Sequence, residues 1–494
     1  MTDDRTNSSG AMSSGEGADG GVDRLFETVV AGGYCVGCGA CAAARPDAID
    51  MGLDGVGRLR AERRLGGSGD AGAKPRIALP VLDVCPFSER AATEDELAAS
   101  LYPDLPHHRR LGRVRSVWAG HVAEDEYRER GSSGGMGSWL IAEQLRAGLA
   151  DAVVHVRPRE RTADDPRMVE YRVSRTAAEI AEGAKSRYHP IELSGVVDEI
   201  RSGSDRFVFV GIPCFVKALR LLQARDAALR DRVVSAVGLF CGHLKSVAFA
   251  EMFAWQLGVP PDRLRSFDYR VALEGRPASR YGVRAEGVDA AGELRARTAP
   301  THSLFGFNWG HGFFKYKACD YCDDVVGELA DASVGDAWLP RYVPDHRGDN
   351  VLIVRSGAID ELVRSAVAAG RLGLEPASEE DVVASQSSGF AHRHEGLAYR
   401  LAKADARGDW RPPKRIRPDA GALPRRRRRL LDLRERLVER SHEAFAEAKR
   451  AGDFGLFRRR MEPLVRSYEA ARRPGGPRAV LGRGKRLLKR LLGR

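Results

Sequence analysis

The chain has 494 residues, of which 43% are hydrophobic, and a formal net charge of +11. It is long enough for two or three domains with a buried core, and no stretch approaches the roughly 18–20 consecutive apolar residues of a membrane-spanning helix. After residue 410 the charge sums to roughly +18, whereas the rest of the chain carries roughly −7, so the basicity belongs to the C-terminal part.

The first residues, MTDDRTNSSGAMSSGEGADGG, are acidic and rich in Gly and Ser. They have no apolar core, so they do not match a secretory signal. We interpret residues 1–24 as a disordered leader and expect a cytoplasmic protein. In a reducing compartment, clustered cysteines are more often metal ligands than disulfides, and this chain has 8 cysteines.

Three cysteines follow a predicted short helix at two-residue intervals, in YCVGCGACAA. Cys35, Cys38 and Cys41 form this run, and Cys85 comes later in a Cys-Pro pair. Structural zinc sites usually pair cysteines across a long gap, whereas three at this spacing suit an iron–sulfur cube as in bacterial ferredoxins. We therefore predict a ferredoxin-like 4Fe-4S segment over residues 25–105 with Cys85 as the fourth ligand. A structural zinc site is the alternative.

After a helical stretch (EDELAASLYP) and a linker over residues 103–110, predicted strands alternate with predicted helices. The strands are VRSVWAGHV, DAVVHVR, RFVFVGIPC, VVSAVGLFC, DASVGDAW and NVLIVRS, and the helices include SSGGMGSWLIAEQLRAGL, FVKALRLLQ and AIDELVRSAVAAG. This alternation predicts a layered α/β (α+β) core with substantial parallel pairing. We assign residues 110–200 and 201–375 to its N-terminal and C-terminal parts.

A second set of four cysteines lies within this core. Cys214 and Cys241 each end a predicted strand, and the sequence CDYC supplies Cys319 and Cys322. The carboxyl edge of an α/β sheet is where such folds collect ligands, so the four thiolates are candidates for a second cluster. The alternative for Cys214 and Cys241 is a buried cysteine that acts only as a small hydrophobic residue.

Several motifs together resemble the coenzyme F420 hydrogenase/dehydrogenase beta-subunit family. They are SSGGMGSWLIAEQLRAGLADAVV, GIPC, FCGH and CDYCDDVVGELADASVGDAW, and the resemblance covers residues 25–371. It implies a flavoprotein with FAD close to a 4Fe-4S cluster, which is held at the positions of the second cysteine set. Members with a ferredoxin-like front end, such as 7-hydroxymethyl chlorophyll a reductase, carry two clusters, and this sequence resembles them.

The resemblance also implies where FAD binds. The glycine-rich turn opens a predicted helix, whose N-terminus favours an anion such as a pyrophosphate. The family usually has GSKY and TPCQ where this chain has KSRY and IPCF, so the flavin contacts there are altered. The candidate flavin-binding residues are Ser133, Gly134, Gly135, Lys185, Ser186, Arg187, Tyr188 and Pro213. An ordinary helix entry and solvated loop charges are the alternatives.

Two residues are candidates for catalysis. Asp336 lies in VGDAW, where the alternative is a structural turn, and His243 lies two residues after Cys241 as a possible proton donor, where the alternative is structural packing. We expect electrons from ferredoxin or another redox protein to pass through two 4Fe-4S clusters to FAD and then to a small organic substrate. The alternatives are an oxidoreductase that uses the deazaflavin coenzyme F420, and an electron-transfer or docking subunit without a substrate of its own.

Residues 376–494 are predicted to be a linker and a basic helical tail. LLDLRERLVERSHEAFAEAKRAG has the pattern of a charged amphipathic helix, and RGKRLLKRLLGR places leucines on one face among cations. This pattern fits an anionic surface, including a peripheral position at a membrane, or an acidic partner. Few aromatic residues are available to stack on bases, so we expect no specific nucleic acid. A solvated helical appendage is the alternative.

Overall fold

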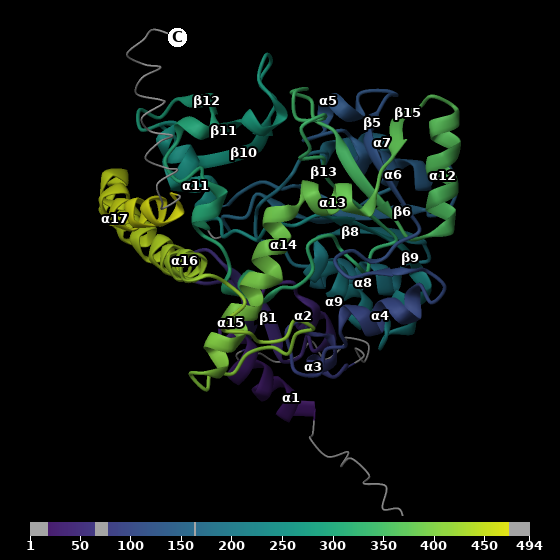
Figure 1. Cartoon of the computed structure of the whole chain (residues 1–494), viewed down its shortest axis with the longest axis horizontal. Helices are drawn as coiled ribbons and strands as arrows, with labels where there is room; N and C mark the ends of the chain where they lie inside the picture. The colour runs from purple at the N-terminus through teal and green to yellow at the C-terminus, as the bar shows by residue number, and fades with distance from the viewer. Residues whose placement is uncertain (1–17, 65–77, 163–164, 474–494) are drawn as a thin grey trace, which may run out of the picture.

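The computed structural model describes residues 18–64, 78–162 and 165–473. Its centre is an eight-stranded mixed sheet (Figure 1). In spatial order the strands are β15 (Leu372–Pro376), β5 (Ser116–Val122), β14 (Asn350–Val354), β13 (Ala332–Asp336), β9 (Val233–Leu239), β8 (Phe207–Gly211), β6 (Ala152–Pro158) and β7 (Val169–Ser174). The four central strands β13, β9, β8 and β6 are parallel, and the outer pairings are antiparallel. The predicted α/β class with parallel pairing is confirmed.

Helices cover both faces of this sheet. One face buries Val153, Val208 and Val237 against α6 (Met136–Arg146), α7 (Ala177–Glu182) and α12 (Gly357–Ala368). The opposite face buries side chains such as Phe209 and Ala236 against α8 (Ser194–Ser202), α9 (Pro213–Gln223) and α10 (Ala227–Arg232). Strands that are buried on both faces read as continuous apolar runs, which is the pattern seen in RFVFVG and VVSAVGL.

The N-terminal segment packs on the second of these faces. It comprises α1 (Ala18–Leu25), a π-helix η1 (Phe26–Val30), α2 (Ala40–Ala44), the hairpin of β1 (Ile49–Leu53) and β2 (Leu59–Arg63), α3 (Val81–Val84) and α4 (Glu94–Leu101). Helix α1 begins inside the predicted disordered leader, because Val22 and Leu25 are buried in the same cluster as α8 and α9. Residues 1–17 of that leader lie outside the described residues, as does the stretch from 65 to 77, which contains GGSGDAGAKP.

Short elements link the main ones. The predicted linker contains β3 (His107–His108), which pairs with β4 (Gly112–Arg113). The others are α5 (Tyr127–Arg130), η2 (Pro261–Arg263), η3 (Ala278–Arg280), η4 (Thr301–Ser303), η5 (Trp309–His311) and η6 (Lys317–Tyr321).

A second, smaller unit was not foreseen from the sequence. Its antiparallel sheet comprises β10 (Leu264–Val271), β11 (Gly282–Val288) and β12 (Leu294–Pro300), and α11 (Ala248–Gln256) packs on it. Figure 1 shows the long helices α16 (Arg425–Ala451) and α17 (Phe454–Arg472) beside α11. Leu437, Phe445 and Phe457 of these helices are buried in the same cluster as Phe253 and Phe267.

The region predicted as linker and tail therefore contributes to the core as far as residue 473. Helices α13 (Glu379–Ser385), α14 (Ser387–Arg393) and α15 (Glu395–Asp405) lead from the large sheet to α16. The terminal RGKRLLKRLLGR lies outside the described residues. Among the helices that the structure describes, none has the length and apolar character needed to cross a membrane.

Candidate functional site

The first cysteine set surrounds one small cavity. Cys35, Cys38, Cys41 and Cys85 all line it, and the rest of the lining is mainly apolar, from Leu25, Val29, Val30, Val36, Met51 and Phe87. Cys41 lies on α2, and Cys85 directly follows α3. The structure thus brings the C-x2-C-x2-C run and the distant Cys-Pro pair together, as the sequence predicts.

Two glycines allow the chain to turn this closely. Gly37 has φ +70°, and a Cβ there would lie 2.4 Å from the carbonyl oxygen of Leu59. Gly39 has φ +82°, and its Cβ would lie 2.5 Å from a carboxylate oxygen of Glu192. L-residues rarely adopt these backbone angles, so both positions require glycine. The Gly37 N–H also donates a hydrogen bond to Cys35 Sγ, at 3.4 Å.

Burial keeps these thiols protonated in the absence of a cation. It raises the pKa of Cys35, Cys38 and Cys41, and it raises the pKa of Cys85 to about 12. Burying four thiolates is unfavourable on its own, and a bound metal compensates for that cost because thiolates, not thiols, are the ligands. Four thiols around one apolar cavity match the donor set of a 4Fe-4S cluster. Among the described residues, no three His, Cys, Asp or Glu side chains are grouped closely enough to hold a single metal ion.

The second cysteine set lies where the central parallel strands end. Cys214 is in the first turn of α9 just after β8, and Cys241 follows β9. Cys319 is on η6, and Cys322 directly follows this helix. Burial first, and then the other three cysteines, raise the pKa of Cys214 well above its usual value.

Cys319 and Cys322 resemble Cys214 in that burial raises the pKa of their thiols. Burial raises the pKa of Cys319 to about 12 and that of Cys322 to about 11. The Leu244 N–H donates to Cys319 Sγ at 3.2 Å. Backbone N–H groups that point at sulfur are typical of the surroundings of iron–sulfur clusters. The four thiols of the second set therefore match the donor set of a second 4Fe-4S cluster.

The two cysteine sets are neighbours. Cys38 of the first set is among the groups that raise the pKa of Cys214 in the second. Burial, then Cys214 and Cys38, raise the pKa of Tyr171, which therefore lies near both sets. The Tyr171 hydroxyl donates to the carbonyl of Val210 at 3.1 Å, and its ring stacks on Phe209 with centroids 5.3 Å apart.

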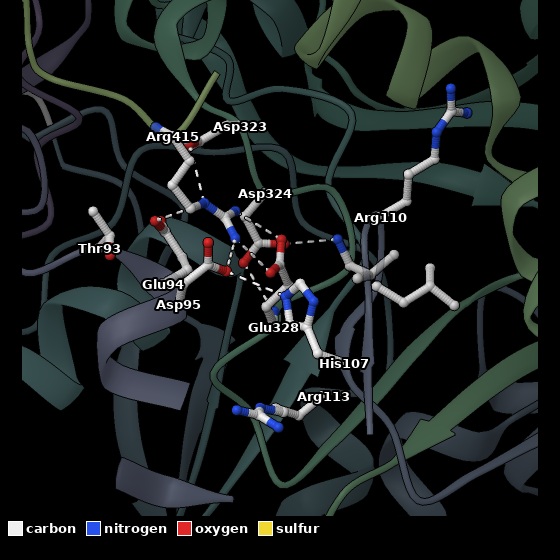
Figure 2. Close-up of polar contacts among 12 residues, drawn as sticks. Thr93, Glu94, Asp95, His107, Arg110, Arg113, Asp323, Asp324, Glu328 and Arg415 are labelled. Atoms are coloured by element: carbon white, nitrogen blue, oxygen red, sulfur yellow. Dashed lines mark hydrogen bonds and ion pairs between the residues drawn. The ribbon is translucent and has the colours of Figure 1, made fainter. Parts of the chain in front are cut away.

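A group of five carboxylates, buried except for the exposed Asp95, includes the two residues that follow Cys322. Figure 2 shows Arg415 reaching in among Glu94, Asp95, Asp323 and Glu328. Arg415 donates to both oxygens of Glu328 at 2.8 Å and to Asp95 at 2.8 Å. Burial raises the pKa of Glu328 to about 7, against the opposing effect of Arg415. We call this group, Glu94, Asp95, Asp323, Asp324 and Glu328, the acidic cluster.

A third site lies at the same edge of the large sheet. The loop that precedes α6 and the loop that follows α7 meet there, because the Ser186 N–H donates to Ser132 Oγ at 2.8 Å and Lys185 Nζ donates to the carbonyl of Gly131 at 3.2 Å. Gly134 and Gly135 have φ of +54° and +82° and lead into α6. The two predicted flavin-binding loops are therefore in contact.

Asp336, the last residue of β13, anchors an arginine at this site. Arg270 on β10 donates to its two carboxylate oxygens at 3.0 and 3.3 Å. Arg270 also donates to the carbonyl of Ser132 at 3.4 Å. Burial raises the pKa of Tyr188, which lies beside Arg270, to about 12. Asp336 is thus placed by an ion pair with Arg270 next to the glycine-rich turn.

Aromatic rings connect this site to the second cysteine set. His243 stacks on Trp309 with centroids 4.2 Å apart, and Trp309 packs against Tyr188 at 5.1 Å. Burial, followed by the charges of Lys245 and Lys315, lowers the pKa of His243 well below its usual value, so its ring is neutral near pH 7.

Several buried polar atoms here have no hydrogen-bond partner. They are Arg187 Nε, His189 Nδ1, His243 Nε2 and Arg270 Nε. Buried polar groups are nearly always satisfied, so such a group of orphans indicates a site that is completed by a ligand. We call the site formed by the two loops, Asp336, Arg270 and these atoms the polar pocket.

Sequence reasoning missed part of this arrangement. Arg270 comes from β10 and Trp309 from the short helix η5, neither of which has a motif, so no spacing signal marks them. In the sequence, nothing marks Arg270 as buried, because its partner Asp336 is 66 residues away. Pro213, predicted with the flavin residues, is the first residue of α9 and lies beside Cys214 of the second set.

Comparisons with known proteins identify relatives of the central part of the chain. The N-terminal model of the coenzyme F420 hydrogenase/dehydrogenase beta subunit matches residues 117–198, and the C-terminal model matches residues 204–380. Together they cover just over half of the chain. The segment with the first cysteine set and all residues after 380 lie outside these matches.

Two individual relatives are similar to this chain. The coenzyme F420 hydrogenase subunit beta of Methanothermobacter thermautotrophicus is 23% identical over 279 residues, a match that covers 54% of this chain and 87% of that protein. A chain in a solved structure of the F420-reducing NiFe hydrogenase complex from Methanosarcina barkeri has a TM-score of 0.46 and 18% identity. That match covers 64% of this chain and 100% of the other.

Proposed function

Because the chain belongs to the coenzyme F420 hydrogenase/dehydrogenase beta-subunit family, we propose that it is an iron–sulfur flavoprotein oxidoreductase. The observation that carries the proposal is that three sites adjoin one another in the structure. Four thiols lie near the N-terminal hairpin, four more lie at the sheet edge, and the polar pocket follows. Cys38 and Cys214 join the first two sites, and His243 and Trp309 join the last two.

Each cysteine set is proposed to hold one 4Fe-4S cluster. Cys35, Cys38, Cys41 and Cys85 would hold the first, and Cys214, Cys241, Cys319 and Cys322 the second. The support is the donor set, the apolar surroundings and the N–H groups of Gly37 and Leu244 on sulfur. A structural zinc in the first set would give a protein with a single cluster.

The polar pocket is proposed to hold FAD. Ser133, Gly134 and Gly135 form the turn at the N-terminus of α6, whose helix dipole favours an anion, and Lys185 and Arg187 add positive charge for phosphates. Ser186 holds the two loops together through its N–H. The unpaired Nε atoms of Arg187 and Arg270 support an anionic ligand. When bound, a flavin exchanges electron pairs with organic molecules and single electrons with iron–sulfur clusters.

The residues of the pocket would position the flavin. Asp336 fixes Arg270 beside the turn before α6, and the rings of Tyr188 and Trp309 pack against each other near Arg270. We assign His243 to the path of the proton, because its Nε2 is free and its ring lies between the second set and Tyr188. A redox protein such as ferredoxin would deliver electrons near the first set, and the acceptor would be a small organic molecule.

Metal and flavin analysis tests this function. Anaerobically purified protein is expected to contain about eight irons and one FAD per chain, and C38S and C214S are each expected to lose about four irons. About four irons in the wild type, unchanged in C214S, would remove the second cluster from the proposal. Absence of bound flavin would remove the oxidoreductase mechanism.

A second candidate is an oxidoreductase that uses coenzyme F420 itself. It is favoured by the relative from Methanothermobacter thermautotrophicus, which is named a coenzyme F420 hydrogenase subunit. Anaerobic mixing with the reduced deazaflavin, followed by absorbance, separates the candidates. Bleaching of the bound flavin within a mixing experiment supports the deazaflavin as substrate, and an unchanged flavin spectrum supports another small molecule.

A further inference from the structure

Arg393 places a positive charge directly on the second cysteine set. It is the last residue of α14, lies beyond the residues matched by the family models, and is 1% exposed. Its Nη1 donates to Cys322 Sγ at 3.1 Å and to the carbonyl of Asp324, and its Nη2 donates to the carbonyl of Gly242 at 3.0 Å. The guanidinium therefore bridges the loops that carry Cys241 and Cys322.

This cation has no carboxylate to neutralise it. Among the described residues, no Asp or Glu side chain forms an ion pair with Arg393, and its Nε has no hydrogen-bond partner. A buried guanidinium without a counter-ion is costly, so its presence requires negative charge on the sulfurs.

We propose that Arg393 is a positioning residue that neutralises the second cysteine set and raises the reduction potential of the 4Fe-4S cluster held there. The inference rests on the proposed function, since it needs a cluster in this set. Reduction adds one electron, supplied by the cluster of the first set, and breaks no bond. The added negative charge is stabilised by a cation and by hydrogen bonds to sulfur, which are the contributions that a protein uses to tune such potentials.

The consequence is a direction for electron flow. A raised potential at the second set favours transfer from the first set and delivers electrons next to the polar pocket. Because Arg393 lies after residue 380, this adjustment comes from the C-terminal part of the chain and not from the part that the family models match. The same helix brings His392 to Asp320, at 3.0 Å, which fixes α14 against η6.

The test is a redox titration of the full-length protein followed by electron paramagnetic resonance. The signal that is missing in C322S identifies the second cluster, and its absence from the wild type would refute the proposed function itself. In R393Q the midpoint potential of this signal is expected to fall, while the signal of the first set keeps its midpoint. R393K, which keeps the charge but loses the fork of donors, is expected to lie between R393Q and the wild type.

A matched control is R371Q, which removes a partly buried arginine held by Glu124 and Glu143. An unchanged midpoint in R393Q, or an equal fall in R371Q, would overturn the proposal. If R393Q does not retain the second cluster, R393K decides. If R393K retains the second cluster with a shifted midpoint potential, the proposed role of Arg393 is supported. If both variants lose the cluster, Arg393 is needed for the second cysteine set to fold, and the proposal that it tunes the potential is overturned.

Discussion

Gly37 is a position where adding one methyl group should remove the first cluster and leave the second in place. Its φ is +70°, and an added Cβ would meet the carbonyl oxygen of Leu59 at 2.4 Å. Backbone on both sides leaves little room to relax, so we expect G37A to lose the first cluster and keep the second. Iron content should fall from about eight to about four per chain.

The control for this change is Gly55, in the turn between β1 and β2. An added Cβ at Gly55 meets nothing within 4 Å, so G55A should keep its iron. A full complement of iron in G37A would show that the first set tolerates a rearranged loop. The measurement is iron per chain after anaerobic purification, with the second cluster's signal as a check that the protein is folded.

His155 provides a pH-dependent contribution to stability. Its Nε2 is 2.8 Å from Ser174 Oγ, and burial first, then Arg157, lower its pKa to about 4, while Glu179 and Glu182 oppose this. The folded-state pKa is below the unfolded value, so the contribution is complete above about pH 6.5 and is lost as the pH falls toward 4. Its full size is about 3 kcal/mol.

We expect H155Q to weaken the acid sensitivity of the protein. The fall in melting temperature between about pH 7 and about pH 4.5 should be smaller in H155Q than in the wild type. The more exposed His346 serves as the control, and H346Q should keep the wild-type fall. An equal fall in H155Q and the wild type would contradict the neutral buried state of His155.

Among individual residues, the sequence could predict those that belong to a motif with a characteristic spacing. Cys35, Cys38 and Cys41 are recognisable from their intervals, and Cys85 from the proline after it. Arg393 and Arg270 are not, because each acts through a partner that is close only after folding. An isolated arginine in a charged sequence carries no signal that distinguishes a buried donor from a solvated surface charge.

Among the elements, α16 differs most from its prediction as part of a basic tail. The helix itself was predicted from its amphipathic pattern, but its apolar face packs on α11 beside β10 and β11. The partner surface was missed because β10 and β12 contain many charged residues and lack a clear alternation. A helix pattern shows which face is apolar but not which element covers it.

Leu437 tests whether α16 is part of the fold. It is fully buried, so L437A should cost about 2–5 kcal/mol of unfolding free energy through lost contacts and a residual cavity. The exposed neighbour Arg436 is the control, and R436A should change stability by less than about 0.5 kcal/mol. Denaturant unfolding followed by tryptophan fluorescence measures both. Equal stability of the two variants would make α16 an appendage.

The segment between α15 and α16 tests the acidic cluster. Arg415 is the cation that Glu328, Asp323 and Asp95 share, and its side chain is 16% exposed. R415M leaves buried carboxylates without their partner and should cost about 3–5 kcal/mol. The double variant R415M/E328Q should recover part of this loss, because one uncompensated charge is removed with the arginine.

The control for R415M is an ion pair on the surface, formed by Arg407 and Asp409, which are both about half exposed. R407M should change the unfolding free energy by less than about 1 kcal/mol, since exposed ion pairs contribute little. If R415M were as stable as R407M, the carboxylates of the acidic cluster would have to be protonated in the wild type. Thermal melts at neutral pH compare the variants directly.

At the scale of the whole molecule, three sites adjoin one another in order from the N-terminal hairpin to the polar pocket. The sequence indicated the order of the first two, because one set precedes the α/β core and the other lies at its strand ends. It did not show that Cys38 and Cys214 are neighbours, since this depends on how the N-terminal segment packs on α8 and α9.

This arrangement predicts a difference between protein and small-molecule reductants. In C38S, a diffusible reductant should still reduce the flavin, whereas a reduced ferredoxin should do so far more slowly than in the wild type. Rapid anaerobic mixing followed at the flavin absorbance measures both rates. Unchanged reduction by ferredoxin in C38S would mean that electrons enter elsewhere, and C214S should impair the ferredoxin reaction to a similar extent.

The segment that follows α14 contacts residues around the first cysteine set, and its Lys414 is among the charges that act on Cys322 of the second set. The carbonyl of Trp410 accepts a hydrogen bond from the Tyr34 hydroxyl at 3.1 Å, and Lys414 lies over the ring of Phe87 at 4.7 Å. All eight cysteines are made before this segment, since a ribosome synthesises the chain from the N-terminus. A nascent chain thus presents both sets without their cover until residues 393–415 emerge, which leaves an interval in which iron and sulfide can be delivered before the protein closes over them.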